Sequence, residues 1–227
     1  MLVIALDTST PAVTAGLVRL GERPVSLADR VTVNARAHGE LLAPHVREVL
    51  AEAGCGLADV DAIVVGAGPG PFTGLRAGMV TAGSLGHAAD KPVHPVCGLD
   101  AIAARIEDDA PALVVTDARR REVYWAAYEA GTRVRTTGPH VQRPDEVPAT
   151  ELGIRVGAGE KAELVAGIDG VGPQYPSPVG LVEAARGELL ADAEPAPLVP
   201  LYLRRPDARA PGPPKPVSPA EPVRGRS

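Results

Sequence analysis

Four polar residues near the start of the chain have side chains that could bind phosphate. Asp7, Thr8, Ser9 and Thr10 come directly after the apolar run of residues 2–6. Hydroxyls and backbone amides at a strand end can hold phosphate oxygens, and a carboxylate can hold a metal ion through water. The alternative is a capped turn, because Asp, Ser and Thr also satisfy their own backbone in turns.

A second polar loop has the same form. Asp117 ends an apolar run within residues 112–120, but three arginines at 119–121 replace the small residues that would let a backbone approach phosphate. Gly157 and Gly159 end a further strand pattern, where a nucleoside could rest. These loops together predict a nucleotide-binding cleft, formed by Asp7, Thr8, Ser9, Asp117, Gly157 and Gly159.

The histidines and cysteines form no pattern of metal binding or catalysis. A metal pair on one helix needs i, i+4 spacing, whereas His38 and His45 are seven residues apart, about 10.5 Å of helical rise. Cys55 and Cys97 form no CxxC motif, and the sequence has no GxSxG elbow. We therefore expect no metal site and no nucleophilic catalysis, and two reduced thiols, as is typical of a cytoplasmic protein.

The segment GAGPGPFTGLRAG at 66–78 is rich in Gly and Pro and leads into a helical pattern at 73–90, with Thr73 as its expected N-cap. It is not a P-loop, and Pro71 breaks a GxGxxG motif. Small residues recur every fourth position along the helix, at Gly74, Gly78, Ala82 and Gly86. Each interior Gly costs roughly 1 kcal/mol relative to Ala, so another element should approach this stripe closely. Its spacing favours packing inside the same chain, with a second chain as the alternative.

The rest of the sequence predicts two similar sets of strands and helices that carry these loops. Strand patterns at 2–6, 12–20 and 25–33 precede a helix at 38–54, a strand at 61–68, the helix at 73–90, a strand at 91–96 and a helix at 98–109. Strand patterns then restart at 112–120, 122–130, 132–138 and 154–160, with helices at 161–168 and 178–191 and a closing segment at 198–205. Two meander-plus-helix lobes predict an α/β protein with a cleft between them.

Charge and composition limit the partners. Net charge is −5, and residues 206–227 carry +2, which leaves −7 on the rest of the chain. Such a balance argues against strong direct binding to nucleic acid. The chain has no apolar run of membrane-spanning length and no basic leader, so we expect no membrane association. Residues 206–227 contain seven prolines and are expected to be disordered.

Several of these segments together resemble the TsaB (YeaZ) family. The resemblance is carried by LDTST, GAGPGPFTGLRAG, DARRREVYWAAY and PLYLR, in matching order over about residues 1–205. Pro71 departs from the small Ser that is usual in the family. The resemblance implies an actin/Hsp70-like (ASKHA) fold of two lobes, which we place at residues 1–105 and 106–205. The tail at 206–227 has no counterpart in the family and is expected from its composition alone.

The resemblance also implies a function. The family is a non-catalytic subunit that pairs with TsaD and TsaE for N6-threonylcarbamoylation of adenosine 37 in tRNAs that read codons starting with A. TsaD carries a metal-binding HxxxH motif that this chain lacks. No cofactor would be required, although weak ATP or ADP binding is compatible with the fold.

In this family the first two helices of the N-terminal lobe form the partner surface, with a homodimer as the fallback when the chain is alone. The residues carried over are His38, Leu41, Leu42, His45, Val49, Thr73, Gly74, Arg76, Ala77, Gly78, Thr81, Ala82 and Leu85. The resemblance thus reverses the expectation from spacing and assigns the small-residue stripe to a second chain. It predicts that Gly78→Leu leaves the fold intact and abolishes partner binding.

Two other functions fit the same framework. A kinase-like or ATP-hydrolysing enzyme would use Asp7, Asp117 and the Gly157/Gly159 pair on a nucleotide. An M22-type metallopeptidase would need a metal site, for which the sequence offers no ligand spacing.

Overall fold

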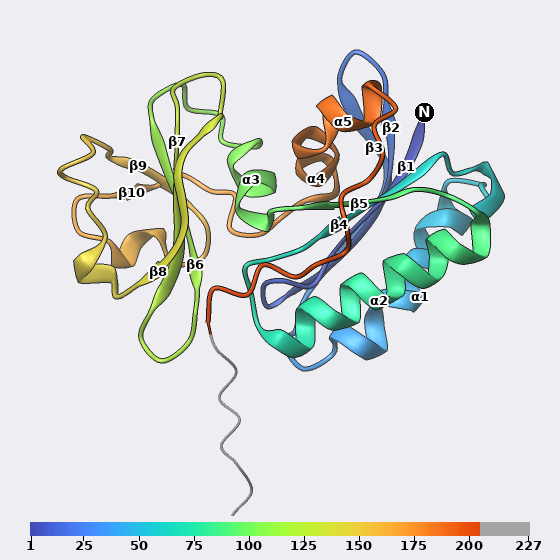
Figure 1. Cartoon of the computed structure of the whole chain (residues 1–227), viewed down its shortest axis with the longest axis horizontal. Coiled ribbons are helices and arrows are strands. Elements are labelled where there is room, and N and C mark those ends of the chain that lie inside the picture. The colour runs from blue at the N-terminus through green and yellow to red at the C-terminus, as the bar shows by residue number, and fades with distance from the viewer. Residues whose placement is uncertain (205–227) are drawn as a thin grey trace, which may run out of the picture.

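The computed structural model describes residues 1–204 as an α/β protein with two five-stranded mixed sheets (Figure 1). The first sheet contains β3 (Pro24–Val33), β2 (Ala12–Leu20), β1 (Leu2–Asp7), β4 (Ala62–Gly66) and β5 (Val93–Val96), in that spatial order. β1, β2 and β3 form an antiparallel meander, and β4 and β5 run parallel to β1. Asp7 therefore lies at the carboxyl end of a central strand.

The second sheet repeats this arrangement. Its order is β10 (Asp169–Gly170), β9 (Val156–Ala158), β6 (Ala112–Asp117), β7 (Val123–Tyr128) and β8 (Arg135–Gln142). β6, β7 and β8 form the antiparallel meander, while β9 runs parallel to β6 and β10 parallel to β9. The predicted duplication is confirmed, and Asp117 ends β6 as Asp7 ends β1.

Helices cover both faces of the first sheet because β1 and β4 are apolar on both sides, as buried parallel strands usually are. α1 (His38–Glu52) and α2 (Phe72–Ala89) lie on one face, where Leu42, Val46 and Met79 join the core around Ile4 and Ile63. On the other face, a separate cluster includes Val3, Val64 and Leu181.

That second face is covered by α4 (Pro178–Ala184) and α5 (Arg186–Leu190), which come from the far end of the chain. α3 (Gly98–Ala103) packs between α4 and the second sheet. A boundary after residue 105 would assign α4 and α5 to the C-terminal lobe, whereas in the structure they pack on the N-terminal sheet. Residues 206–227, the predicted tail, lie outside the described part of the chain.

Several element boundaries differ from the predictions. α2 begins at Phe72 after Pro71, and no side chain caps it, so Thr73 is not its N-cap. The helix expected at 161–168 is only the 3-10 turn η3 (Ala162–Leu164), and α3 is shorter than the expected 98–109. Two further 3-10 turns, η1 (Leu57–Asp59) and η2 (Pro144–Glu146), complete the described chain.

Candidate functional site: the Asp7 loop, the inter-lobe cleft and the α1–α2 surface

The Asp7 loop, residues 7–10, is enclosed by the protein. Asp7 is 0% exposed, and Thr8, Ser9 and Thr10 are at most 4% exposed. The carboxylate of Asp7 accepts hydrogen bonds from the backbone N–H and the hydroxyl of Ser9, each at 2.9 Å. Thr8 donates its hydroxyl to the Gly74 carbonyl at 2.7 Å. The loop is therefore a buried turn in which Ser9 bonds to Asp7 and Thr8 bonds to α2, while Ser9 and Thr10 line the inter-lobe cleft.

Glycines surround this loop because no side chain would fit against it. A Cβ on Gly66 would overlap the Asp7 carboxylate, and one on Gly70 would overlap the Ser9 carbonyl. Cβ atoms on Gly74 and Gly78 would meet Thr8, and one on Gly98 would lie 2.8 Å from Ser9 Oγ. We call Gly66, Gly70, Gly74, Gly78 and Gly98 the glycine shell. The glycines of segment 66–78 therefore leave the space that the Asp7 loop occupies.

The prediction that the stripe on α2 faces a second chain is therefore wrong. Gly78 contacts Thr8, Ala82 is 0% exposed in the first core, and Gly86 packs against Val93. Packing within the chain, which the spacing alone favoured, is correct. The resemblance named whole helices as the partner surface but could not say which side of each helix is outside.

Burial also changes the acidity of Asp7. Removal from water raises the pKa of the Asp7 carboxyl to about 7, against the opposing effect of the Ser9 hydrogen bonds. The carboxyl does not line the cleft between the lobes. A metal ion or phosphate in that cleft would therefore not meet Asp7 in this conformation.

The inter-lobe cleft is a cavity of about 550 Å³. Its walls come from Ser9 to Pro11, the starts of α1 and α2, the β6–β7 turn and residues 202–204. Of the six residues predicted to bind nucleotide, only Ser9 and Asp117 line it. Gly157 instead packs against Ile168, and Gly159, with φ of +91°, lies against the Val115 carbonyl.

Arginines dominate the charge of the cleft. Arg36, Arg119 and Arg204 line it, and Asp117 is the acidic residue among its described lining residues. Arg204 forms an ion pair with Glu122. The three residues from 119 to 121 are all exposed and have φ of 60°, 53° and 63°, a left-handed turn that L-residues adopt at a cost of roughly 1 kcal/mol each. The sequence of residues 119–121 argued against a phosphate-binding loop. In the structure these arginines lie at the positively charged edge of the cleft.

Residues 198–204 cross over α2 and form the mouth of the cleft. Leu201 N–H donates to the Ala67 carbonyl at 2.8 Å. Tyr202 stacks on Phe72 with ring centroids 5.2 Å apart, and the Arg76 guanidinium lies 3.8 Å from the Phe72 centroid. Arg76 Nε also donates to the Tyr202 hydroxyl at 3.3 Å. Sequence reasoning missed this cluster, because Phe72 and Tyr202 are far apart along the chain.

A second polar cluster joins the lobes behind the cleft. Tyr128 donates its hydroxyl to Asp100 Oδ1 at 2.8 Å, and Arg135 Nε lies 3.6 Å from the same oxygen. Burial raises the pKa of the Cys97 thiol to about 12, with a further contribution from Asp100. Cys97 therefore remains a protonated thiol at neutral pH.

The predicted partner residues on α1 and α2 divide into two groups. Seven are buried within the chain and cannot meet a partner: His38, Leu42, His45, Val49, Gly74, Gly78 and Ala82. The other six are exposed or half-buried and stay a prediction: Leu41, Thr73, Arg76, Ala77, Thr81 and Leu85.

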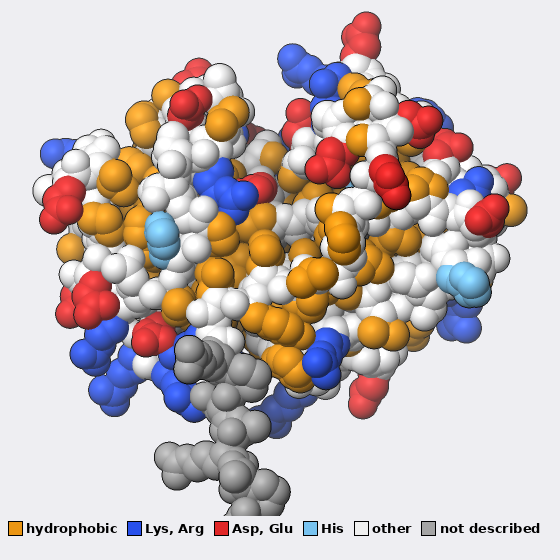
Figure 2. Space-filling model, viewed as in Figure 1, with side chains coloured by type: hydrophobic (Ala, Val, Ile, Leu, Met, Phe, Trp, Pro, Cys, Tyr) orange, Lys and Arg blue, Asp and Glu red, His pale blue; other side chains and the backbone are white. Residues whose placement is uncertain are grey.

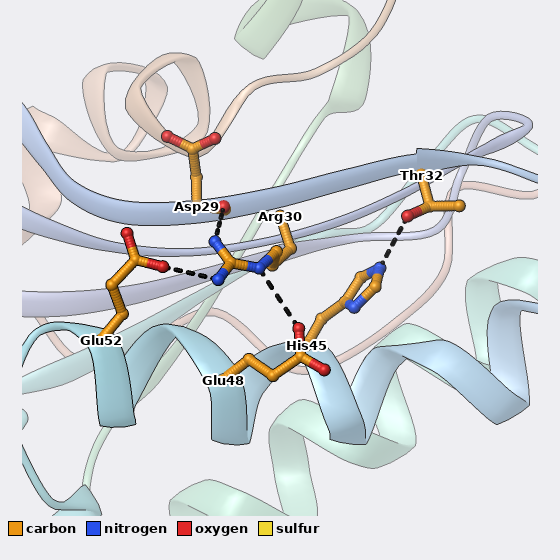
Figure 3. Close-up of polar contacts among 6 residues, drawn as sticks. All are labelled: Asp29, Arg30, Thr32, His45, Glu48 and Glu52. Carbon is orange, nitrogen blue, oxygen red and sulfur yellow. Dashed lines mark hydrogen bonds and ion pairs between the residues drawn. The ribbon is translucent and has the colours of Figure 1, made fainter.

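Polar contacts explain why one side of α1 is unavailable (Figure 3). Arg30 on β3 binds Glu48, at 3.2 Å, and Glu52, both on α1. His45 Nε2 lies 3.0 Å from the Thr32 hydroxyl. These contacts hold α1 against β3. His45 therefore stabilises the fold and does not lie on the exposed side of α1.

The exposed side of the helix pair carries small side chains. On α2 the exposed or half-buried positions Ala77, Ser84 and Ala88 follow helical spacing, as do Ala43 and Ala51 on α1. We call these five residues the α1–α2 surface. Exposed Arg47 lies between the two alanines of α1 and exposed Val80 lies between Ala77 and Ser84, so longer side chains interrupt this row. Gly74, Gly78 and Gly86 of α2 face inward.

Within residues 1–204, no cluster of three or more His, Cys, Asp or Glu side chains has the geometry to hold a metal ion. No helix of that region is both long and apolar enough to cross a membrane.

The two sheets, their shared strand order and the cleft between them define an actin/Hsp70-like α/β protein. A family model described as TsaD, tRNA N6-adenosine threonylcarbamoyltransferase, matches residues 32–178. The structure of YeaZ from Pseudomonas aeruginosa is similar, with a TM-score of 0.76 and 30% identity over 89% of this chain and 99% of that one.

Two curated relatives are similar to this chain. The tRNA threonylcarbamoyladenosine biosynthesis protein TsaB of Haemophilus influenzae is 38% identical over 128 residues, 54% of this chain and 52% of that protein. A Mycobacterium tuberculosis protein whose name states no function is 56% identical over 208 residues, 91% of this chain and 93% of that protein. The chain belongs to the TsaB (YeaZ) family of tRNA threonylcarbamoyladenosine biosynthesis.

Proposed function

We propose that this protein is a non-catalytic subunit that binds a TsaD-type transferase through the α1–α2 surface. The observation that carries the proposal is the exposed row of small side chains on two adjacent helices. Ala and Ser at these positions allow another helix to approach between the longer side chains of Arg47 and Val80. The family match adds support, because residues 32–178 of this chain, which contain both helices, resemble the transferase itself. A related partner would offer a similar helix pair, so the two chains could pack about a pseudo-two-fold axis.

The environment of Asp7 supports a non-catalytic role. In a phosphate-transferring enzyme this carboxylate would face the cleft, whereas here it is fully buried beneath the glycine shell and bonded to Ser9. The role needs no cofactor, and we propose at most weak ATP or ADP binding in the cleft. TsaE is the proposed third member of the assembly, and self-pairing through the same helices is the alternative for the isolated chain.

Charged substitutions on the α1–α2 surface test the proposal. Ser84→Arg on α2 and Ala43→Arg on α1 place a long cation where close packing is needed. Each should weaken binding to the TsaD-type protein of the same organism by at least about tenfold, as substitutions at the centre of an interface often do. Binding is measured by calorimetry with the two full-length proteins.

Ala130→Arg is the matched control, because Ala130 is exposed in the β7–β8 turn of the other lobe. It should bind the partner normally. Thermal unfolding of all three variants shows whether the fold is kept. The proposal fails if well-folded Ser84→Arg and Ala43→Arg proteins both bind with unchanged affinity.

A further inference from the structure

The rim of the inter-lobe cleft concentrates positive charge on a protein whose net charge is −5. Arg36 precedes α1, Arg119 lies in the β6–β7 turn and Arg204 lies near the end of the described chain, yet all three line one cavity. Glu122 neutralises Arg204. Arg36 and Arg119 therefore supply the excess charge, on opposite walls of the cleft.

The positive charge continues beyond the cavity itself. Arg120 and Arg121 are exposed beside Arg119, and Arg76 is exposed on the other lobe beside the mouth. Figure 2 shows Lys and Arg side chains gathered along the lower edge of both lobes. A mononucleotide would need only the cleft, whereas a cationic rim across both lobes suits a ligand with several phosphates along a chain.

Aromatic rings lie at the same place. Phe72 and Tyr202 are each 42% exposed, stack with an interplanar angle of 23° and line the cleft together with Tyr124. Exposed rings beside arginines are the combination that single-stranded nucleic acids use, with bases on the rings and phosphates on the cations. An acidic peptide would use the arginines but has no planar groups for the aromatic pair.

We propose that the mouth of the inter-lobe cleft binds a single-stranded segment of RNA, with Arg36 and Arg119 on its phosphates and a base stacked at Tyr202. The site rests on the proposed function, since it gives the subunit a direct contact with the RNA being modified. The negative net charge led us to expect no strong binding to nucleic acid. Local binding here is compatible with that charge, because screening in salt confines the effect of distant carboxylates to about 10 Å. Asp117, the acidic residue of the described lining, offsets one of the two charges of Arg36 and Arg119.

The test uses the full-length chain and a fluorescently labelled single-stranded RNA of about fifteen nucleotides, with affinity read from anisotropy over a series of salt concentrations. Arg36→Glu and Arg119→Glu should each weaken binding at least about tenfold and reduce the slope of log affinity against log salt by about one. Tyr202→Ala should weaken binding about tenfold and leave that slope unchanged, because stacking releases no counterions. Arg155→Glu, an exposed arginine of the second lobe outside the cleft, is the matched control and should bind like the unchanged protein.

Two further measurements separate the explanations. ATP added as competitor should displace the RNA only weakly; displacement by ATP at equal nucleotide concentration would overturn the RNA site in favour of a mononucleotide site. Calorimetry of Arg119→Glu with the TsaD-type partner should show normal binding, so a failure of the RNA site leaves the subunit proposal intact. Absence of RNA binding, or equal losses in Arg155→Glu and Arg119→Glu, would also overturn the RNA site.

Discussion

The two Asp loops occupy equivalent positions in the two lobes and have opposite environments. Asp7 ends β1, is fully buried and lies within the glycine shell. Asp117 ends β6, is half-buried, lines the cleft and is followed by three exposed arginines. One copy of the repeated turn therefore stabilises the N-terminal lobe, and the other presents Arg119 to the inter-lobe cleft.

The difference shows how a repeated turn can acquire two roles. Around Asp7, glycines remove side chains so that α2 and α3 can approach the loop. After Asp117, the arginines at 119–121 have a left-handed backbone and exposed side chains. The comparison predicts that the first loop tolerates almost no added atoms, while the second tolerates removal of its side chains.

The largest expected effect is the pH dependence caused by Asp7. Its folded-state pKa, about 7, lies above the unfolded value near 3.9. The folded protein therefore binds the proton more tightly, and the resulting stability is present below pH 4 and is lost as pH rises through 7. The loss amounts to roughly 4 kcal/mol, since each pKa unit corresponds to about 1.4 kcal/mol.

Urea unfolding of Asp7→Asn and of the unchanged protein between pH 4 and 8 measures this effect. Asp7→Asn should lose most of the decline in unfolding free energy over that range. Asp192→Asn, at an exposed left-handed position that Asn tolerates, should keep it. A decline of equal size in Asp7→Asn would show that other groups cause it.

Next in size is a substitution within the glycine shell. Gly78→Leu should lower the unfolding free energy by about 3 kcal/mol, because its Cβ would already overlap the Thr8 hydroxyl in a close-packed region. This corrects the expectation that the variant would fold normally and fail only in partner binding. Gly39→Ala in α1 is the control, because no atom lies near the added Cβ. It should raise the unfolding free energy by less than about 1 kcal/mol. Normal stability of Gly78→Leu would contradict the shell.

Within residues 1–204 the sequence was sufficient to predict the duplication and every strand except β10, because alternating and continuous apolar runs such as 61–68 report local burial directly. The two residues of β10 form no apolar run, and β8 begins three residues later than predicted. The sequence could not show where α4 would pack. Leu181 and Val182 mark an apolar face on that helix, but either sheet could have covered it, and only the three-dimensional path of residues 171–178 decides.

The candidate site was predictable only in part, for a similar reason. The four-residue spacing of Gly74 and Gly78 indicates that another part of a protein packs closely against α2. It does not distinguish a loop of the same chain from a helix of a second chain. The sequence contains no local pattern that predicts the Phe72–Tyr202 stack, because the two residues are far apart along the chain and neither is unusual in its own segment. The family resemblance supplied the two helices of the proposed surface and not their exposed sides.

A smaller effect is expected where the two loops are connected. The C-terminal segment contacts both loop regions. Leu201 N–H donates to the Ala67 carbonyl near the first loop, and Arg204 forms an ion pair with Glu122 beside the second loop. Both side chains are partly exposed, so Arg204→Ala should lower the unfolding free energy by about 1 kcal/mol or less. Salt should reduce the loss, which thermal unfolding at low and high ionic strength would detect. A loss that is independent of salt would mean that Arg204 acts through packing of its stem.

The smallest effect has the opposite sign and distinguishes the loops most directly. Arg121→Gly removes a side chain from a residue with φ of 63°. Gly adopts this region without the Cβ clash, although it loses more backbone entropy on folding, so a net gain of about 0.5 kcal/mol is expected. Denaturant unfolding of Arg121→Gly beside Arg155→Gly measures it, the control being an exposed arginine with no positive φ. Arg155→Gly has the same entropy cost without the relief of a left-handed backbone, so it should lose about 0.4–1 kcal/mol of unfolding free energy. A loss in Arg121→Gly as large as that in Arg155→Gly would show that the second loop is also a structural turn, and the contrast between the two Asp loops would then be one of degree.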